Sequence, residues 1–382
     1  MDKKEFENSL VRQARVTRDM IRCVYDSVTA QLGEALPAKE IFDAQKIFIT
    51  GCGDSWLAGV ACKAAFESIT KVETFAMRAI EFSRHLNGKN LGYSPNTPMV
   101  LVISFSGEAT RAVECAIRAS ERGANTIAIT NNPNSRLAKA CRHTICVGLP
   151  EGGEYFPGAT TYNASMTALL LVAMRMGRAK NTISGEEYLD MRQALLDYAE
   201  AVQAQVPAYE DEAFRLAQQW QNLRAVDFIG DYSDYATAFF GSAKIIETYG
   251  GYTTYDDSED WCHINYFLAQ PETIGRVVIA NPSTPSFGRI QETLAAVKLL
   301  GSPCIVVSHG SKDLFDSSFH VFSMPEPRYF WLAPLLQHTP FNLVAGYIAA
   351  LKGEAPFRMG MEAFATPLGQ NRLNKGTEIK IV

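Results

Sequence analysis

Two polar turns carry the residue types that bind phosphate. In the first, Ser104 and Ser106 follow the apolar run 100–103, and Gly107 comes directly after them. From Ala112 onward the apolar spacing is helical, so the serines lie between a buried strand and a helix start. Hydroxyls, a flexible glycine and unpaired helix N–H groups together attract phosphate. The alternative is that the two serines only cap the helix.

The second turn follows an earlier apolar strand. Residues 50–55 read TGCGDS and place Gly53 and Ser55 ahead of a helix with a face of alanines. A Gly-x-Gly sequence is a weak signal by itself. Two such turns at the carboxyl ends of strands in one α/β unit favour a ligand site, because open parallel sheets bind ligands there.

Alternating strands and helices must position these turns. We predict a first unit over residues 46–180 and a second over 225–353, both with right-handed crossovers between parallel strands. The order of elements repeats, which indicates an internal duplication. The expected strands are 47–50, 71–76, 100–104, 126–130 and 143–147, then 226–229, 252–255, 276–280, 304–308 and 321–323. The fold class is therefore α/β, with two tandem flavodoxin-like units of three layers.

Three further segments flank these units. Residues 1–45 have the amphipathic spacing of helices, either an arm on a partner subunit or a lid on the core. Residues 181–224 are charged and helical, and Pro207 is expected to break this connector. Residues 354–382 form a tail that contains glycine and proline. In the second unit the third strand leads into Asn281 rather than into a serine turn, so that unit is expected to have a task other than phosphate binding.

Composition narrows the function classes. The 382 residues carry a net charge of −5 without a basic run, so no nucleic-acid partner is expected. We also expect no membrane partner, since no apolar run is long enough to span one, and the charged start lacks a signal-peptide core. The eight cysteines are scattered without zinc-ligand spacing, which favours a reduced, cytoplasmic protein with no metal site.

At low identity, residues 45–375 resemble a known family. ITGCGDS, LVISFSGEAT and IAITNNPNSRLA look like the sugar isomerase (SIS) domain. The two-unit order resembles the isomerase half of glutamine–fructose-6-phosphate amidotransferase and related fructosamine-6-phosphate deglycases. The glutaminase half of that enzyme has no counterpart in this sequence, so we do not expect the chain to make ammonia from glutamine.

The resemblance implies four catalytic residues. GSAKIIE resembles the lysine-x-x-glutamate helix of the family, and it puts Lys244 and Glu247 on one helix face. Glu247 would carry a proton between C1 and C2 of a sugar. His263, with the family's separation of 16 residues from Glu247 (263 − 247), would open the sugar ring. Lys375 in the tail would steady an enolate or imine, and Lys244 would support Glu247. Each could instead be an ordinary surface or core residue.

The same resemblance implies the substrate-binding residues. Besides Gly53, Ser55, Ser104 and Ser106 they are Thr110, Thr160 and Thr161. Phe105 stands where the family has a glutamine, and Ile264-Asn265 where it has Gly-Pro after the histidine. These departures concern the sugar pocket more than the phosphate turns.

The expected function is phosphosugar processing without a cofactor. The first hypothesis is a deglycase or deaminase of a fructosamine 6-phosphate or amino-sugar phosphate, with the acidic run Asp256–Asp260 binding an amine. The alternatives are an aldose–ketose phosphosugar isomerase and a non-catalytic phosphosugar-binding regulator. In this family the histidine reaches the site of a neighbouring subunit, so we expect a homodimer with shared active sites.

Overall fold

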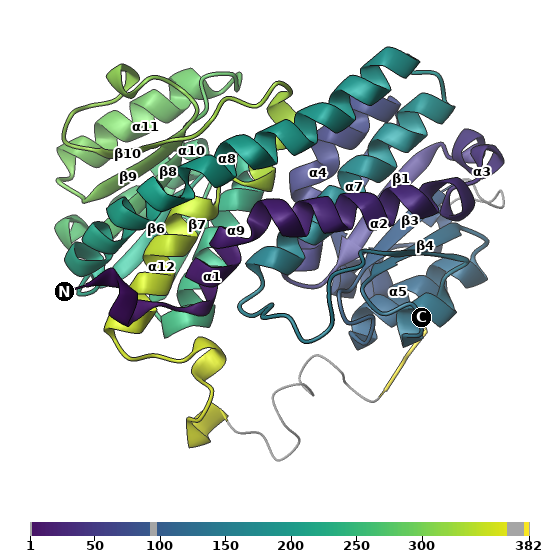
Figure 1. Ribbon diagram of the computed structural model, residues 1–382, viewed down its shortest axis with the longest axis horizontal. Coiled ribbons are helices and arrows are strands. Elements are labelled where there is room, and N and C mark those ends of the chain that lie inside the picture. The colour runs from purple at the N-terminus through teal and green to yellow at the C-terminus, as the bar shows by residue number, and fades with distance from the viewer. Residues whose placement is uncertain (1, 92–97, 365–377, 382) are drawn as a thin grey trace. The chain divides into compact units, whose positions relative to one another are not determined.

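The computed structural model describes residues 2–91, 98–364 and 378–381 (Figure 1). Its contacts divide the chain into two compact units. The first unit comprises residues 19–153, 160–196 and 366–382, and the second comprises residues 1–18, 154–159 and 197–365. The short stretch 154–159 therefore packs with the second unit, although it lies between elements of the first in the sequence.

The first unit contains a parallel five-stranded sheet of order β2-β1-β3-β4-β5. This flavodoxin-like order reverses direction between β1 and β3. Phe48, Val100 and Val102 point to one face and pack on α5, whereas Ile49 points to α4 on the other. The strands are β1 (Lys46–Gly51), β2 (Glu73–Arg78), β3 (Pro98–Ile103), β4 (Asn125–Thr130) and β5 (His143–Cys146).

Helices cover both faces of this sheet. The alanines at 58, 61, 64 and 65 are buried on α4, and those at 112, 116 and 119 on α5, as their spacing predicted. The helices of this part of the chain are α2 (Thr17–Ala35), α3 (Ala38–Asp43), α4 (Asp54–Thr70), α5 (Thr110–Glu121), α6 (Arg136–Ala140) and α7 (Ala159–Ala179).

The second unit repeats the topology. Its parallel sheet has the order β10-β9-β8-β6-β7, so the two sheets share one connectivity, and the expectation of a duplicated α/β fold is confirmed. All ten predicted strands are present, with small differences at their ends. The strands are β6 (Ala225–Ile229), β7 (Tyr252–Asp256), β8 (Ile274–Ile279), β9 (Cys304–Ser308) and β10 (His320–Ser323).

The two faces of the second sheet carry different helices (Figure 1). Phe228 on β6 meets Phe341 of α12 and lies against Gly241 of α9. Its neighbour Ile229 points the other way and packs with Trp261 of α10 and Ile290 of α11. The helices are α9 (Ser233–Tyr249), α10 (Ser258–His263), α11 (Phe287–Leu299) and α12 (Thr339–Leu351), and α1 (Ser9–Arg15) packs on α12.

The expected break at Pro207 is wrong. A single helix, α8, runs from Gly185 to Trp220 with the proline inside it. An internal proline costs about 3 kcal/mol because it lacks an N–H and crowds the preceding turn. Buried side chains on both sides of it, including Val206 and Tyr209, anchor the helix, and the Tyr209 hydroxyl donates to the Ser323 carbonyl at 2.7 Å. Tertiary packing therefore outweighs the local preference.

The remaining predictions about segments are mixed. Leu10, Ile21 and Val24 of the N-terminal helices are buried, whereas Val16, which directly follows α1, is exposed. The cysteines form no disulfide; Cys62, Cys115 and Cys304 are buried, while Cys146 is only half-buried. No helix among the described residues combines the length and the apolar character that a membrane span requires.

Candidate functional site

The two serine turns lie side by side at one edge of the first sheet. β1 and β3 are paired in register from Lys46 and Pro98 to Gly51 and Ile103, so both strands end at the same level. The turns 52–53 and 104–109 leave from these ends. The strand order reverses at this point, which is where open α/β sheets bind ligands.

Glycines make the first turn compact. A Cβ on Gly51 would lie 2.7 Å from Ser55 Cβ and 2.9 Å from the Ile103 carbonyl oxygen. Gly53 precedes α4 with a φ of +54°, a conformation that side chains disfavour. Ser55 is half-buried in the first turn of α4, and its N–H donates to the Cys52 carbonyl. Backbone and hydroxyl groups are thus brought together with little side-chain bulk.

The second turn is equally tight. Gly107 has a φ of +67° and donates to the Ser104 carbonyl at 2.9 Å, and a Cβ there would lie 2.0 Å from Ser135 Oγ. The Ser106 hydroxyl is exposed and accepts from the Glu108 N–H at 3.3 Å. Ser104 is buried, as is Thr110, which begins α5. The structure therefore brings the predicted serines to a helix start.

Arg136 is a residue of this turn that sequence reasoning missed. Its Nε lies 2.8 Å from Glu108 Oε2, and its Nη2 donates to the Glu108 carbonyl at 2.6 Å. A third contact joins the Arg136 backbone N–H to Glu108 Oε1. Arg136 thus makes three contacts with Glu108, and its guanidinium lies next to the serine turn. It stands in the segment NNPNSRLA, which carried the family resemblance, and that was the available signal.

Thr160 and Thr161 start α7 in the same unit. Thr160 is 5 % exposed and Thr161 is half-buried. Within this unit α7 contacts α4, where the Cys62 thiol approaches the Met166 carbonyl at 3.8 Å. Both threonines thus lie at a helix N-terminus, as Ser55 does on α4.

Lys244 and Glu247 form an ion pair on α9 of the second unit. The Lys244 side chain is fully buried, and its Nζ donates to the Pro157 carbonyl at 2.7 Å. It also lies over the Phe240 ring, 4.5 Å from the centroid. The Glu247 side chain keeps 27 % of its surface exposed, so this side chain is partly accessible while that of Lys244 is not.

Burial fixes the protonation state of a histidine beside this pair. The His338 ring packs at a tilt against Phe240, and its two ring nitrogens face the Leu335 carbonyl and the Asn342 amide. Burial lowers the pKa of His338 to about 3, and the Lys244 ammonium contributes to the decrease. His338 is therefore neutral at pH 7, and the positive charge at this end of α9 belongs to Lys244.

His263 has a different environment. It ends α10 with 68 % of its side chain exposed, and its Nε2 lies 3.0 Å from Glu259 Oε1. Arg289 on α11 holds the other oxygen of Glu259 at 2.6 Å. Hydrogen bonding to His263 lowers the pKa of Glu259. His263 is thus a surface residue, and the interpretation of it as a core histidine is wrong.

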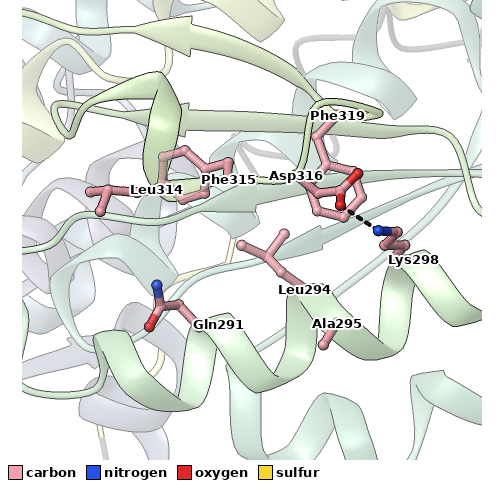
Figure 2. A pocket seen from close by; sticks show the side chains of 8 residues that line it. All are labelled: Gln291, Leu294, Ala295, Lys298, Leu314, Phe315, Asp316 and Phe319. Carbon is pink, nitrogen blue, oxygen red and sulfur yellow. Dashed lines mark hydrogen bonds and ion pairs between the residues drawn. The ribbon is translucent and has the colours of Figure 1, made fainter.

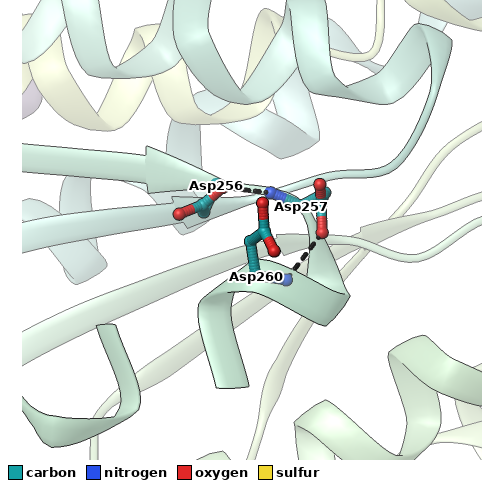
Figure 3. A group of neighbouring side chains, drawn as sticks. All are labelled: Asp256, Asp257 and Asp260. Atoms are coloured by element: carbon teal, nitrogen blue, oxygen red, sulfur yellow. Dashed lines mark hydrogen bonds between the residues drawn. The ribbon is translucent and has the colours of Figure 1, made fainter. Parts of the chain in front are cut away.

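The acidic run Asp256–Asp260 spans the end of β7 and the start of α10. Asp256 ends β7, and Asp257 caps α10. The Asp257 carboxylate accepts from the Asp260 N–H (Figure 3) and also from the Glu259 N–H. Among the described residues, Asp256, Asp257 and Asp260 are the one group whose donor atoms are close enough to share a metal ion. Burial raises the pKa of Asp256. Because Asp257 caps α10, the closeness of these carboxylates is explained by the helix start without a metal ion.

Lys375 lies outside the described residues. The chain after it is described from Glu378, whose carbonyl accepts from Arg111 Nη2 at 2.9 Å. The Lys380 N–H donates to Glu114 Oε1 at 2.8 Å, so the end of the chain contacts α5 of the first unit.

A cavity of about 280 Å³ lies elsewhere in the second unit (Figure 2). It is lined by one face of α11 and by residues 314–319, and the Lys298–Asp316 ion pair closes one side. None of the residues predicted from the sequence lines this cavity, so it is separate from the candidate site.

Comparison with known proteins shows which family part of the chain matches. The SIS domain family matches residues 40–175. Glutamine–fructose-6-phosphate aminotransferase of Listeria monocytogenes is 25 % identical over 346 residues, which cover 88 % of this chain and 54 % of that protein. The enzyme of the same name from Streptococcus pneumoniae is 24 % identical over 89 % of this chain. The chain thus spans about half the length of these curated relatives.

Solved structures share the fold. The C-terminal domain of glucosamine-fructose-6-phosphate aminotransferase from Francisella tularensis matches with a TM-score of 0.81 at 17 % identity, covering 93 % of this chain and 99 % of that one. Tagatose-6-phosphate ketose/aldose isomerase from Escherichia coli gives 0.73 at 16 % identity, with coverage of 91 % and 94 %. Glucosamine-6-phosphate deaminase from Thermotoga maritima gives 0.67 at 16 %, with coverage of 91 % and 96 %.

Proposed function

Residues 40–175 of this chain match the SIS domain family, and on that premise we propose that the protein is a phosphosugar-processing enzyme. The observation that carries the proposal is the Lys244–Glu247 pair, in which a buried ammonium contacts a partly exposed glutamate. Neutral core packing has no need for this arrangement, and burying a lysine is costly unless its charge is used or compensated. A proton-transfer reaction gives the pair a role.

The first unit would bind the phosphate group. Ser55 and Ser106 supply hydroxyls at helix starts, and Gly53 and Gly107 allow the backbone to approach closely. Arg136 adds a cation that Glu108 orients. Binding energy from the phosphate, which does not react, would hold the sugar carbons in place for the chemical step.

The second unit would carry out the proton transfer. Glu247 would take a proton from one of the carbons C1 and C2 and return it to the other, while Lys244 stabilises its carboxylate form. His263 would exchange a proton with the ring oxygen during ring opening. Lys375 would stabilise negative charge on the enolate oxygen or an imine nitrogen. For substrate binding we propose a further set of residues, namely Gly53, Ser55, Ser104, Ser106, Thr110, Thr160 and Thr161.

For the substrate we propose a fructosamine 6-phosphate or an amino-sugar phosphate. Proton transfer from C1 to C2 through an enolamine would convert a ketosamine into an imine, and water would then release the amine and leave a hexose phosphate. The acidic residues Asp256 and Asp260 at the start of α10 would attract the amine. Aldose–ketose isomerisation is the second candidate, because it uses the same proton transfer without the hydrolysis.

A substrate panel distinguishes these reactions. Fructoselysine 6-phosphate, glucosamine 6-phosphate, fructose 6-phosphate and tagatose 6-phosphate are incubated with the protein, and hexose phosphate, free amine and ketose–aldose conversion are measured. Amine release from either of the first two supports the deglycase or deaminase. Conversion of only the last two supports the isomerase, and absence of turnover on all four contradicts both enzymatic proposals.

The third candidate is a phosphosugar-binding regulator. Such a protein needs the phosphate turns but not the Lys244–Glu247 pair. If Glu247→Gln leaves every measured activity of the protein intact, the regulator is favoured. If the variant still binds phosphosugar but loses turnover, the enzyme is favoured.

We also propose a homodimer with shared active sites. Glu247 and His263 lie on helices that cover opposite faces of one sheet, which supports a site assembled from two copies. Sedimentation at working concentration tests this, and a monomeric active protein would contradict it.

A further inference from the structure

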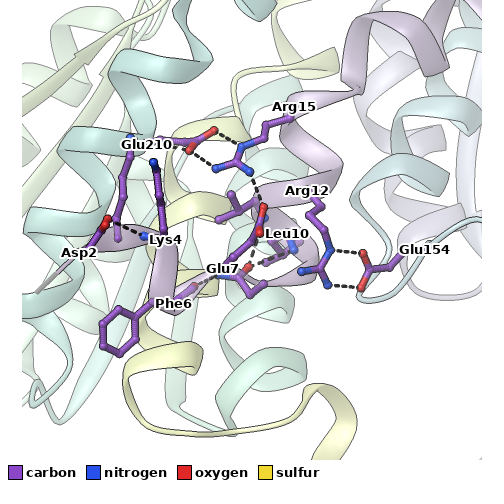
Figure 4. A network of polar contacts seen from close by, with 12 residues as sticks. Asp2, Lys4, Phe6, Glu7, Leu10, Arg12, Arg15, Glu154 and Glu210 are labelled. Carbon is purple, nitrogen blue, oxygen red and sulfur yellow. Dashed lines mark hydrogen bonds and ion pairs between the residues drawn. The ribbon is translucent and has the colours of Figure 1, made fainter.

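A six-residue segment, residues 154–159, connects the N-terminal helix to the candidate base. The segment packs within the second unit, together with α1 and α9. Arg12 of α1 makes two hydrogen bonds to the Glu154 carboxylate, at 2.7 and 2.6 Å (Figure 4). The neighbouring residue Gln13 donates through Nε2 to the Phe156 carbonyl at 2.9 Å.

The next carbonyl in the segment accepts a hydrogen bond from Lys244, one of the proposed catalytic residues. Lys244 Nζ donates to the Pro157 oxygen at 2.7 Å, and the same ammonium contacts Glu247. Consecutive carbonyls, those of Phe156 and Pro157, therefore accept from Gln13 on one side and from Lys244 on the other. The position of the segment is coupled through these bonds to the position of the ammonium.

Contacts with α8 and α12 hold α1 in place within the second unit. Asn8 caps the helix through hydrogen bonds to the N–H groups of Leu10 and Val11. Arg15 makes two hydrogen bonds of 2.8 Å to Glu210 on α8, and Figure 4 shows these beside the Arg12–Glu154 pair. A Cβ on Gly346 of α12 would lie 2.4 Å from Asn8 Oδ1, so α1 also packs closely on α12.

Gln13 is a polar side chain in a buried position. Only 3 % of its surface is exposed, and an apolar side chain of the same size would fill such a site without needing polar partners. Its amide reaches the one carbonyl that precedes the acceptor of Lys244. Small displacements of a reacting group lower rates by large factors. The hydrogen bond from Gln13 to the Phe156 carbonyl, which we call the clamp, would therefore act on catalysis as well as on packing.

We infer that Gln13 is a positioning residue that holds the segment 154–159 so that the Pro157 carbonyl fixes Lys244, and thereby Glu247, in the reactive arrangement. This inference rests on the proposed proton-transfer function. It gives the N-terminal helix a role in catalysis, which the proposed function alone does not.

The test compares two glutamine-to-leucine variants of the full chain. Gln13→Leu removes the amide while keeping the volume of the side chain. Gln31→Leu is the matched control, because Gln31 also donates to a backbone carbonyl, that of Cys146, but in the first unit. For the best substrate of the panel we expect Gln13→Leu to lower kcat about 10-fold with KM changed less than two-fold, and Gln31→Leu to lower kcat less than two-fold.

Several outcomes would overturn the inference. Wild-type kcat in Gln13→Leu would do so, and so would equal losses in both glutamine variants, which would indicate a general effect on folding. If Gln13→Leu does not fold, Arg12→Ala removes the exposed ion pair to Glu154 instead, and an unchanged kcat there counts against the clamp.

A crystal structure of Gln13→Leu separates this inference from the proposed function. The expected result is loss or lengthening of the bond between Lys244 Nζ and the Pro157 carbonyl. An unaltered bond overturns the clamp, whether or not the protein turns over any substrate. Absence of turnover by the wild-type protein, with the bond lost in the variant, contradicts the proposed function and leaves the clamp supported.

Discussion

Glu247 and His263 are carried by helices on opposite faces of the same five-stranded sheet. α9, with Glu247 near its end, packs with α12 against the face that contains Phe228. α10, which ends at His263, packs with α11 against the face that contains Ile229. This separation by the sheet is the geometric basis of the proposed site shared between two copies of the chain.

Mixing two inactive variants tests this arrangement. Glu247→Gln and His263→Asn each remove one group from every site of a homodimer. After exchange of subunits, half of the dimers are mixed and each has one intact site, so activity should recover to about a quarter of wild type. Steady-state turnover before and after exchange measures the recovery. No recovery, with exchange verified by mass, would mean that the two residues act within one chain or that one of them does not act.

Glu247→Gln should remove catalysis and spare binding. The amide keeps the size of the side chain but cannot take up a proton, so turnover should fall about 10²- to 10⁴-fold. Titration calorimetry with the phosphosugar should show affinity within a few-fold of wild type. Glu292→Gln is the control, because Glu292 is an exposed glutamate that pairs with Arg289 on α11. Equal losses in the two variants would contradict the assignment of Glu247 as the base.

Ser106→Ala should weaken the binding of phosphorylated sugars specifically. A hydrogen bond to a charged group contributes about 1.5–3 kcal/mol, which corresponds to an increase of about 10- to 100-fold in KM. The same sugar without its phosphate is the control ligand, because its weak binding should not change. A similar loss for both ligands would place Ser106 at the sugar rather than at the phosphate.

Gly107→Ala should destabilise the first unit more than its backbone angle explains. A positive φ costs a non-glycine residue about 1 kcal/mol, and the new Cβ would also meet the Ser135 hydroxyl at 2.0 Å. Gly152→Ala is matched, because Gly152 has a φ of +73° with nothing within 4 Å of its Cβ position. Denaturant unfolding should show a loss of about 2–4 kcal/mol for Gly107→Ala and about 1 kcal/mol for Gly152→Ala. Equal losses would mean that the turn relaxes around the methyl group.

Stability should depend on pH through His338. Its pKa is about 3 in the folded chain and about 6.5 in an unfolded one, so between these values only the unfolded chain binds the proton. Stability therefore falls as the pH drops through this window, by up to about 1.4 kcal/mol per pH unit. Between pH 7 and 5, His338→Gln should lose about 2 kcal/mol less than wild type in denaturant unfolding. Equal losses would contradict the neutral buried state.

Asp234 provides the control with the opposite sign. Burial raises its pKa from 3.8 to about 6, so the folded chain keeps a proton that the unfolded chain releases. Its contribution to stability is complete below pH 3.8 and is lost as the pH rises through 6. Asp234→Asn should therefore lose more stability than wild type between pH 7 and 5, whereas His338→Gln loses less.

The sequence determined the elements and the local faces of the site. Apolar β-branched runs gave the ten strands, and the helical spacing of alanines gave the packing faces of α4 and α5, because both patterns are properties of short segments. Lys244 and Glu247 meet because residues three apart on a helix are neighbours, whatever surrounds them. The glycines at 53 and 107 marked turns because few other residues adopt a positive φ.

Tertiary structure decided what those residues face. The continuity of α8 through Pro207, the hold of Arg136 on Glu108 and the exposure of His263 all depend on residues distant in the sequence. Lys244 donates to the carbonyl of Pro157, which is 87 residues away in the sequence. Gln13, near the N-terminus, donates to the carbonyl of the residue before Pro157. Periodicity encodes which way a side chain points on its own element, but the partner it meets is fixed only when separate elements pack together.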